Sequence, residues 1–468
     1  MLTLLEQKYN KYEKYLRDYF IYMILMNSFF YLIFIIYNRA LNNFSPYAPD
    51  IENINIGNGS YAKIGIISDL QVSEELENKF PTLKDYANNV YVTLNYFKKN
   101  GIDLLIIAGD ITNNGRFINL LYFKKIFYSV FNENSQPRVI SIMGNHDYLD
   151  FNFTNSENQK KFYKVIYSYP NSHFIINDFH FILWSQDNYL ISDGGITNYT
   201  WIKNNLEQAR QNLKRKGDPI FVITHIPPKF TVYGSETIWG HTGMYNILKD
   251  YHEVICISGH SHYSLRNAKS IWQKDFTAIN TQSICYVDLD NYFLNAVDVR
   301  RESARDCESM GLIAHLTDKN IVFERVRFLT EEIMDEKWKI DFPINVKVFK
   351  YTLDNLNKKE IPVFHNKLIK TEEKMENKII NYYIVFSAAT HVDYVYKYKI
   401  VLKSNMNKGN PRVLYYYSDY YKNEKYRKKI MKFKLPIMNP DIYNIEIYAI
   451  DSFDNISQPI KGKITIKY

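Results

Sequence analysis

At 468 residues the chain is too long for one typical domain and long enough to bury a sizeable core. Its hydrophobic content of 46% is ordinary for a globular protein, and its three cysteines are too few for a disulfide scaffold. The net charge of +8 is uneven, because residues 345–468 hold 23 lysines and arginines against 12 acidic residues.

The first element in chain order is an apolar segment. Residues 19–38 contain no charged side chain, and about 20 such residues suffice to cross a bilayer as a helix. Lys8, Lys11, Lys14 and Arg17 precede it, which favours a cytoplasmic N-terminus. We expect a cytoplasmic segment 1–18, a transmembrane signal anchor 19–38 and a linker 39–60, with the remainder outside the cytoplasm. The alternatives are a cleaved signal with a secreted product, or a soluble protein with a buried first helix.

Five short apolar runs follow, and each ends on a residue that can bind a metal. Short runs that are rich in β-branched residues and bounded by turn residues predict buried strands. With their terminal polar residues, the runs are 64–69, 104–110, 139–147, 221–225 and 254–262. Helical spacing of apolar residues lies between them, at 86–97, 117–131, 200–213 and 240–248. Strands that alternate with helices predict an α/β layered domain.

The polar residues at the ends of these runs have the composition of a two-metal site. A pair of divalent ions that clamps a phosphoryl group needs a bridging carboxylate, several imidazoles and a few oxygen donors. The chain supplies them as Asp69, Asp110, Asn145, His225, His260 and His262. Because polar groups collected at strand ends form a ligand crevice, the pattern predicts one built metal centre.

The motifs Asp-x-Gln, Gly-Asp-x-x-x-x-Gly, Gly-Asn-His-Asp, Thr-His and Gly-His-x-His, in this order, resemble the calcineurin-like metallophosphoesterases over about residues 61–330. The resemblance implies two packed mixed sheets flanked by helices. It implies that a first metal is held by Asp69, Gln71, Asp110 and His262. Asp110 would bridge to a second metal held by Asn145, His225 and His260. A hydroxide bridging the metals would be the nucleophile, and His146 would assist the leaving group.

One position departs from the common pattern. Most members have Asp-x-His where this chain has Asp69-Leu70-Gln71. An oxygen donor at Gln71 disfavours zinc and suits manganese, magnesium or iron. A similar Asp-x-Gln occurs in the branch that resembles manganese-dependent ADP-ribose/CDP-alcohol diphosphatases. We therefore expect two divalent ions, manganese first, with iron or zinc as alternatives; the other interpretation is a weakened site with one metal poorly held.

Substrate type is narrowed by two further positions. Protein Ser/Thr phosphatases of this family carry an aspartate where this chain has Asn113 and an arginine where it has Met143. A phosphodiester or nucleotide-type substrate is therefore expected. The alternatives are a phosphomonoesterase of the same fold and a non-catalytic surface binding protein with a degenerate metal site. Residues 231–241 either form a substrate wall, with Tyr233, Trp239 or His241 against a base or sugar, or an ordinary packed loop.

The pattern changes again near Pro343. A hairpin predicted at 311–316 and 321–326 closes a phosphoesterase domain 61–342. Strand-like runs then recur at 345–351, 380–388, 394–402, 411–417, 443–450 and 464–467. The end of this region resembles a fibronectin type III or immunoglobulin-like module, so we expect a β-sandwich domain 343–468. Its basic residues, densest at 422–434, would meet an anionic surface or guard a solvated sheet edge. Specific nucleic-acid binding is not expected.

Overall fold

The computed structural model describes residues 21–23, 26, 28, 44–74, 84–133, 135–288, 301–303, 309–334, 336–376, 379–406, 409–422 and 426–467. The chain divides into two compact units, Met1–Pro46 and Tyr47–Tyr468. Most of the predicted span 19–38 lies outside the described residues. Within the part of the chain that is described, no helix has both the length and the apolar character needed to cross a bilayer.

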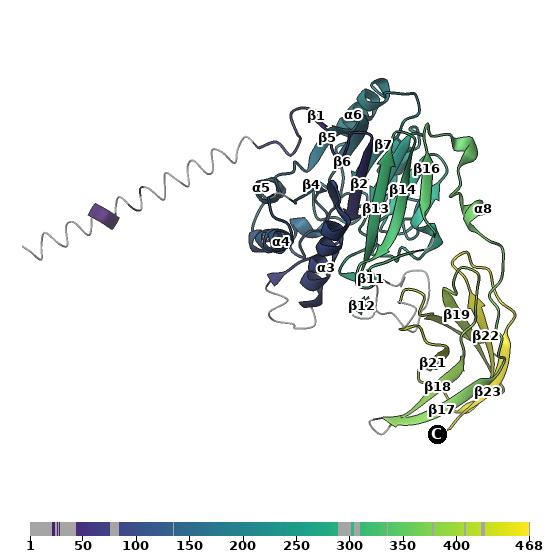
Figure 1. The fold of residues 1–468 in the computed structure, drawn as a ribbon. Coiled ribbons are helices and arrows are strands. Elements are labelled where there is room, and N and C mark those ends of the chain that lie inside the picture. The colour runs from purple at the N-terminus through teal and green to yellow at the C-terminus, as the bar shows by residue number, and fades with distance from the viewer. Residues whose placement is uncertain are drawn as a thin grey trace, which may run out of the picture. The chain divides into compact units, whose positions relative to one another are not determined.

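Two seven-stranded mixed sheets lie within residues 47–341 (Figure 1). The first has the order β1-β5-β6-β7-β8-β10-β9, and the second β15-β14-β13-β2-β3-β4, with β16 paired to β14. The first sheet contains β1 (Glu52–Ile54), β5 (Asn171–Ile176), β6 (Phe179–Trp184), β7 (Ile220–Thr224), β8 (Val254–Ser258), β9 (Ile271–Gln273) and β10 (Thr277–Asn280). The second contains β2 (Tyr61–Ile67), β3 (Leu104–Ala108), β4 (Arg138–Ile142), β13 (Met310–Thr317), β14 (Asn320–Arg327), β15 (Glu332–Ile333) and β16 (Trp338–Asp341).

The predicted strands that end on ligand candidates are the parallel strands of these sheets. β2, β3 and β4 are parallel neighbours in one sheet, and β6, β7 and β8 in the other. Leu104–Ala108 is buried along its whole length, because a parallel strand is covered on both faces. The strands predicted before Asp69, Asp110, Asn145, His225 and His260 are confirmed as β2, β3, β4, β7 and β8. Their carboxyl ends therefore carry the polar residues.

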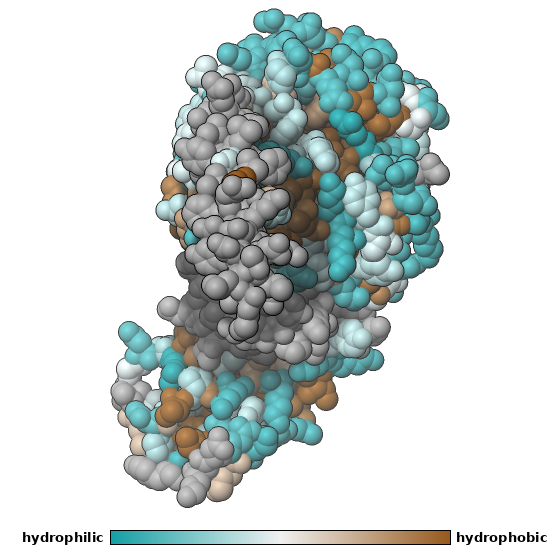
Figure 2. All heavy atoms as spheres, turned by 90° about the vertical axis from the view of Figure 1, so that its left-hand side faces the viewer, coloured by the Kyte–Doolittle hydropathy of each residue, from teal (hydrophilic) through white to brown (hydrophobic). Residues whose placement is uncertain are grey.

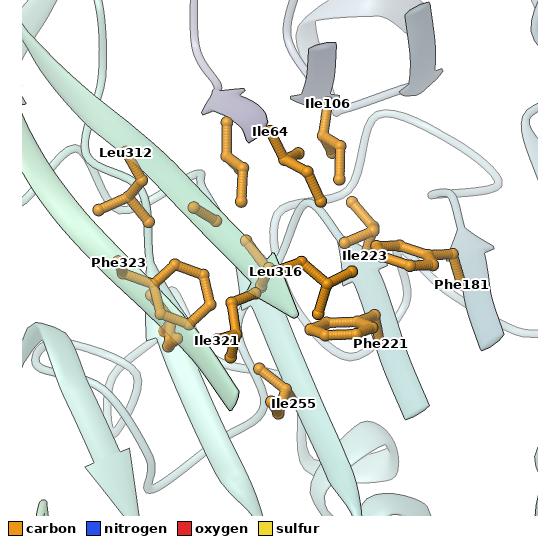
Figure 3. Close-up of a cluster of buried hydrophobic side chains, with 14 of the residues drawn as sticks. Ile64, Ile106, Phe181, Phe221, Ile223, Ile255, Leu312, Leu316, Ile321 and Phe323 are labelled. Carbon is orange, nitrogen blue, oxygen red and sulfur yellow. The ribbon is translucent and has the colours of Figure 1, made fainter. Parts of the chain in front are cut away.

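The main core lies between the two sheets. Figure 3 shows side chains of both sheets meeting there, among them Ile64 and Leu312 from the second sheet and Phe221 from the first. The rings of Phe181 and Phe221 stack at 4.4 Å. A second cluster packs the outer face of the β2–β4 sheet under α3 (Lys84–Asn100), α4 (Phe117–Val130) and α5 (Asn155–Ile166). A third packs the other sheet under α6 (Tyr199–Gln211) and α7 (Thr242–Leu248), so the expected layered α/β fold is confirmed.

The C-terminal region is all-β, as predicted. A three-stranded sheet holds β17 (Ile369–Glu376), β18 (Ile379–Ser387) and β21 (Ile430–Lys434). A four-stranded sheet holds β19 (Lys397–Ser404), β20 (Arg412–Tyr417), β22 (Asp441–Ile450) and β23 (Ile460–Ile466). Both sheets contribute to one hydrophobic core. The resemblance to a fibronectin type III module stays a prediction.

Smaller elements complete the described chain. Strands β11 (Tyr286–Asp288) and β12 (Arg301–Ser303) pair with each other, and α8 (Leu353–Leu356) is a single turn. The strand predicted at 345–351 is wrong: Val346–Val348 is a 3-10 helix, capped by the Asn345 side chain, which accepts from the backbone N–H of Lys347. On the face shown in Figure 2, the coloured surface is mostly hydrophilic, with small hydrophobic patches.

Candidate metal centre

The ligand candidates of both sheets meet at the carboxyl ends of the parallel strands. Asp69 and Asp110 follow β2 and β3 of one sheet, and His225 follows β7 of the other. One ligand atom from each of these three buried residues lies within 4.8 Å of the other two. His225 Nε2 is 3.2 Å from Asp110 Oδ2, and His262 Nε2 is 3.1 Å from Asp69 Oδ1. Residues far apart in the sequence therefore form one compact cluster of nitrogen and oxygen donors.

Each aspartate is held in the same way. Asp69 Oδ2 accepts from the His260 backbone N–H at 3.0 Å and from the Ser68 hydroxyl. Asp110 Oδ1 accepts from the His146 backbone N–H at 2.9 Å. In both residues the other carboxylate oxygen faces a histidine ring nitrogen. The main chain of one ligand loop thus fixes the carboxylate of another and leaves one oxygen of each for a cation.

The loops reach this geometry at a conformational cost. The left-handed backbone region holds five non-glycine ligand candidates, Asp69 (φ 54°), Gln71 (φ 44°), Asp110 (φ 53°), His260 (φ 69°) and His262 (φ 55°). Such residues are uncommon, and each costs about 1–3 kcal/mol, so they mark functional sites. Gly144 permits a close approach, since a Cβ there would lie 2.2 Å from Asp110 Oδ1 and 2.7 Å from His225 Nε2. Backbone strain and a missing side chain therefore both serve the same cluster.

The donor set fits a divalent metal. Within the described residues, Asp69 Oδ1, Asn145 Oδ1 and His225 Nε2 are buried and have no hydrogen-bond partner. Buried polar atoms without partners are rare in folded proteins, and a bound cation satisfies them. The His225 Nδ1–H donates to the Ala108 carbonyl at 2.8 Å, which leaves Nε2 for a metal. In His260 the Nε2–H donates to the Ile191 carbonyl at 3.2 Å, which leaves Nδ1.

The charges of the buried ligand candidates depend on one another. Burial opposes charge on His225, but Asp110 and Asp69 outweigh it and raise the pKa of His225 to about 9. Burial also raises the pKa of Asp69, but His262 and His225 outweigh it and hold that pKa below its ordinary value. Burial, with His225 next to it, lowers the pKa of His260 to about 3, so this ring is neutral near pH 7, as a ligand must be. The two buried carboxylates thus favour a positive charge beside them, which a proton on His225 supplies and a bound cation would supply instead.

His146 and Asp147 lie on the 3-10 helix that follows Asn145 (His146–Tyr148). The Nδ1–H of His146 donates to the Asn113 carbonyl at 2.8 Å, so the ring orientation is fixed from the other motif loop. The Asp147 carboxylate accepts from the backbone N–H groups of Thr112 and Gly144, at 3.0 and 3.1 Å. Burial and the neighbouring Asp110 raise the pKa of Asp147 to about 6. Asp147 therefore ties the second motif loop to the third.

One family of known proteins matches the segment that contains these ligand candidates. Residues 62–264 match the calcineurin-like phosphoesterase family. They form a calcineurin-like phosphoesterase domain. None of the curated proteins compared with the sequence matches it.

Several solved structures also resemble part of the chain, each at low sequence identity. A dimetal phosphatase from Danio rerio is 13% identical, with 60% of this chain and 99% of that chain covered and a TM-score of 0.41. GAP50, the anchor in the inner membrane complex of Plasmodium, is 15% identical, with 62% and 92% covered and a TM-score of 0.39. The purple acid phosphatase PPD1 from yellow lupin (Lupinus luteus) is 11% identical, with 60% and 54% covered and a TM-score of 0.40.

The three predicted substrate residues of the phosphoesterase domain lie in different surroundings. The Trp239 ring is half-buried and packs edge-on against the His260 ring, 5.1 Å between centroids. The Tyr233 hydroxyl is 2.5 Å from the Tyr396 hydroxyl of the C-terminal region. His241 is fully buried, and its Nδ1 accepts from the Met244 backbone N–H at the start of α7. Trp239 thus contacts a ligand candidate of the metal centre.

Two further residues lie beside the site, and the sequence did not indicate them. The Cys285 thiol lies 3.4 Å from Gln71 Oε1, while Gln71 Nε2 is buried without a hydrogen-bond partner in the described chain. The ring of Tyr286 lies 4.2 Å from that of His262. Cys285 and Tyr286 follow the fifth motif by more than 20 residues, and neither belongs to a recognisable pattern. Their place beside Gln71 and His262 arises only from the fold.

Proposed function

We propose that the protein is a dinuclear metal-dependent phosphodiesterase. The observation that carries the proposal is the buried cluster of Asp69, Asp110 and His225 at the paired strand ends, with the His146 backbone N–H on Asp110. Asp69, Gln71, Asp110 and His262 would hold one ion, and Asp110, Asn145, His225 and His260 the other. Two bound ions would lower the pKa of water and neutralise the charge of the transferred phosphoryl group.

Residues around the proposed ions would have separate roles in the reaction. His146 is oriented through Nδ1, so its Nε2 is the atom that would donate a proton to the departing ester oxygen. Asp147 would keep the His146 segment and the Asp110 loop in register through Thr112 and Gly144. Cys285 and Gln71 form an outer contact that would orient the amide of Gln71 towards the first ion.

Metal preference and cellular setting complete the proposal. The amide oxygen donors of Gln71 and Asn145 support manganese over zinc, with iron as the second choice. The uncharged segment 19–38 supports a membrane anchor with the catalytic domain outside the cytoplasm, and the all-β C-terminal region supports a fibronectin type III-like module. The basic residues at 422–434 support contact with an anionic surface.

A paired assay tests the central proposal. The full-length chain, purified in a non-ionic detergent, is stripped of metal and incubated with bis-p-nitrophenyl phosphate or p-nitrophenyl phosphate, together with Mn²⁺, Zn²⁺ or EDTA. We expect Mn²⁺-dependent cleavage of the diester and about two ions per chain. In Asp110→Asn, which loses the bridging charge, both the activity and the metal content should fall, with activity reduced more than about 100-fold. Preference for the monoester, or a chain that binds no metal, would refute the proposal.

A further inference from the structure

An aromatic pair lies on two loops that are connected to residues of the metal centre. The Phe151 and Tyr189 rings meet edge-on at 5.4 Å, with an interplanar angle of 89°. Tyr189 lies on the loop 187–195, whose Ile191 carbonyl accepts from His260. Phe151 lies five residues after His146 in the sequence. Trp239 packs on His260 as well. Trp239 thus contacts the ligand candidate His260, while Tyr189 lies on a loop that is hydrogen-bonded to His260 and Phe151 on the segment that follows His146.

Both rings of the pair are exposed: Phe151 by 71% and Tyr189 by 46%. Their backbone supports, in contrast, are well fixed. The Tyr148 hydroxyl donates to the Gln186 carbonyl at 2.6 Å and so joins the two loops. The buried ion pair of Asp150 and Lys161, at 2.7 Å, holds the residue before Phe151. Large aromatic faces that are exposed but held in place can bind a ligand at little entropic cost.

The Tyr189 loop is ordered by its own side chains. Asp187 Oδ2 accepts from the backbone N–H of Thr197 at 2.7 Å and from its hydroxyl at 2.8 Å. The Asn188 amide donates to the Gly194 carbonyl at 2.9 Å and accepts from the Leu190 backbone N–H at 2.8 Å. An alkyl chain needs continuous apolar surface, whereas a flat ring needs only one or two ring faces or edges.

We propose that Phe151 and Tyr189, together with Trp239, bind a flat aromatic group of the ester, such as a nucleobase or an aryl ring, while its phosphate lies at the metal centre. This inference rests on the proposed phosphodiesterase function. It makes Phe151 and Tyr189 specificity-determining residues, because aromatic stacking and edge contacts recognise a ring without reading its substituents.

The test varies the retained group and keeps the leaving group constant. The full-length chain is assayed with three p-nitrophenyl phosphodiesters, whose second ester group is thymidine-5′-yl, methyl or octyl. We expect kcat/KM for the thymidine ester to exceed that for the methyl ester at least about tenfold, and this ratio to fall about fivefold in Phe151→Ala and in Tyr189→Ala. These two variants decide the matter, since Trp239 also contacts a ligand candidate.

Tyr167→Ala is the matched control. Tyr167 is also 71% exposed, but it lines a cavity with Arg138 at the amino end of β4, away from the metal ligands. Its ratio should equal that of the unaltered protein. Equal ratios in Phe151→Ala, Tyr189→Ala and the unaltered protein would overturn the inference. So would an octyl preference that both variants lose. In either case cleavage of the methyl ester would leave the phosphodiesterase proposal intact, whereas no turnover of any ester would overturn both.

Discussion

His146 contacts the metal cluster through its main chain and the Asn113 loop through its side chain. Its backbone N–H bonds to Asp110 Oδ1, and its ring is held by the Asn113 carbonyl. A replacement other than proline keeps the backbone N–H that makes the first contact, and the imidazole that makes the second is lost. The proposed proton transfer can therefore be removed without disturbing the carboxylate that joins the two metal sites.

We predict that His146→Gln lowers kcat for the diester by about 10²- to 10⁴-fold, the usual contribution of a general acid. Its metal content should stay the same as that of the unaltered protein, because the Asp110 contact comes from the backbone. Kinetics with bis-p-nitrophenyl phosphate and metal analysis by mass spectrometry measure the two quantities. A His146→Gln protein that has lost its metal would instead make His146 part of the binding site.

The sequence alone was enough to predict those ligand candidates that directly follow a strand. Asp69, Asp110 and His225 come directly after apolar runs, and parallel strands bring their carboxyl ends together. Cys285 could not be found in this way, since it lies 214 positions from Gln71 and belongs to no motif. Phe151 and Tyr189 were missed for the same reason, because loop residues carry no periodic signal.

Among the elements, the loop that carries Trp239 is tied to the C-terminal region. The Tyr233 ring packs between Tyr263, at 5.1 Å, and Tyr396, at 5.8 Å. Tyr263 follows the ligand candidate His262 in the chain. The Tyr396 hydroxyl then extends this contact by its hydrogen bond with Tyr233. The C-terminal region thus helps to set the position of a loop beside the metal centre.

Tyr396→Phe removes that hydrogen bond and keeps the ring. A net contribution of about 1 kcal/mol predicts a fall of about fivefold in kcat/KM for the diester. Tyr443→Phe is the control, because the Tyr443 hydroxyl donates only to the Asn439 carbonyl within the C-terminal region, at 3.0 Å. The two variants are compared by steady-state kinetics after equal stability in urea has been checked. The same kinetic loss in both would mean that the Tyr233 contact has no role of its own.

Secondary structure was predicted wrongly where contacts with other parts of the chain determine it. Val346 and Val348 alternate with a lysine, which favours a strand, but they are 40% and 66% exposed. A side-chain cap from Asn345 stabilises a 3-10 turn there instead. β17 was missed because its residues Ile369–Glu376 are mostly charged and exposed, yet the strand pairs along its whole length with β18. Backbone hydrogen bonds to β18 make this segment a strand, although its side-chain pattern does not indicate one.

For the molecule as a whole, stability should depend on pH through two buried histidines in the first sheet. His173 Nε2 lies 2.8 Å from His180 Nδ1, between β5 and β6. Burial, and then His180, lowers the pKa of His173 to about 4, against an ordinary value of 6.5. A lowered pKa means that the unfolded chain takes up the proton first as the pH falls. The stabilisation is complete above about pH 6.5 and is lost towards pH 4.

We predict that this histidine alone removes about 3 kcal/mol of unfolding free energy between pH 7 and pH 4. His173→Gln, which carries no titratable group, should show a correspondingly flatter dependence. Urea unfolding at several pH values, with EDTA throughout, measures the difference and excludes the pH dependence of metal binding. Parallel curves for the two proteins would contradict the predicted shift.

The left-handed backbone at Asp69, Gln71, Asp110, His260 and His262 bears on how such a protein can change over evolutionary time. Glycine adopts this conformation freely, so a glycine at any of these positions would relieve strain while it deleted a ligand. Substitutions that stabilise the fold at these positions would therefore remove metal ligands. All five positions have kept their side chains here, and a relative that had become only a scaffold should reveal itself by glycines at these same places.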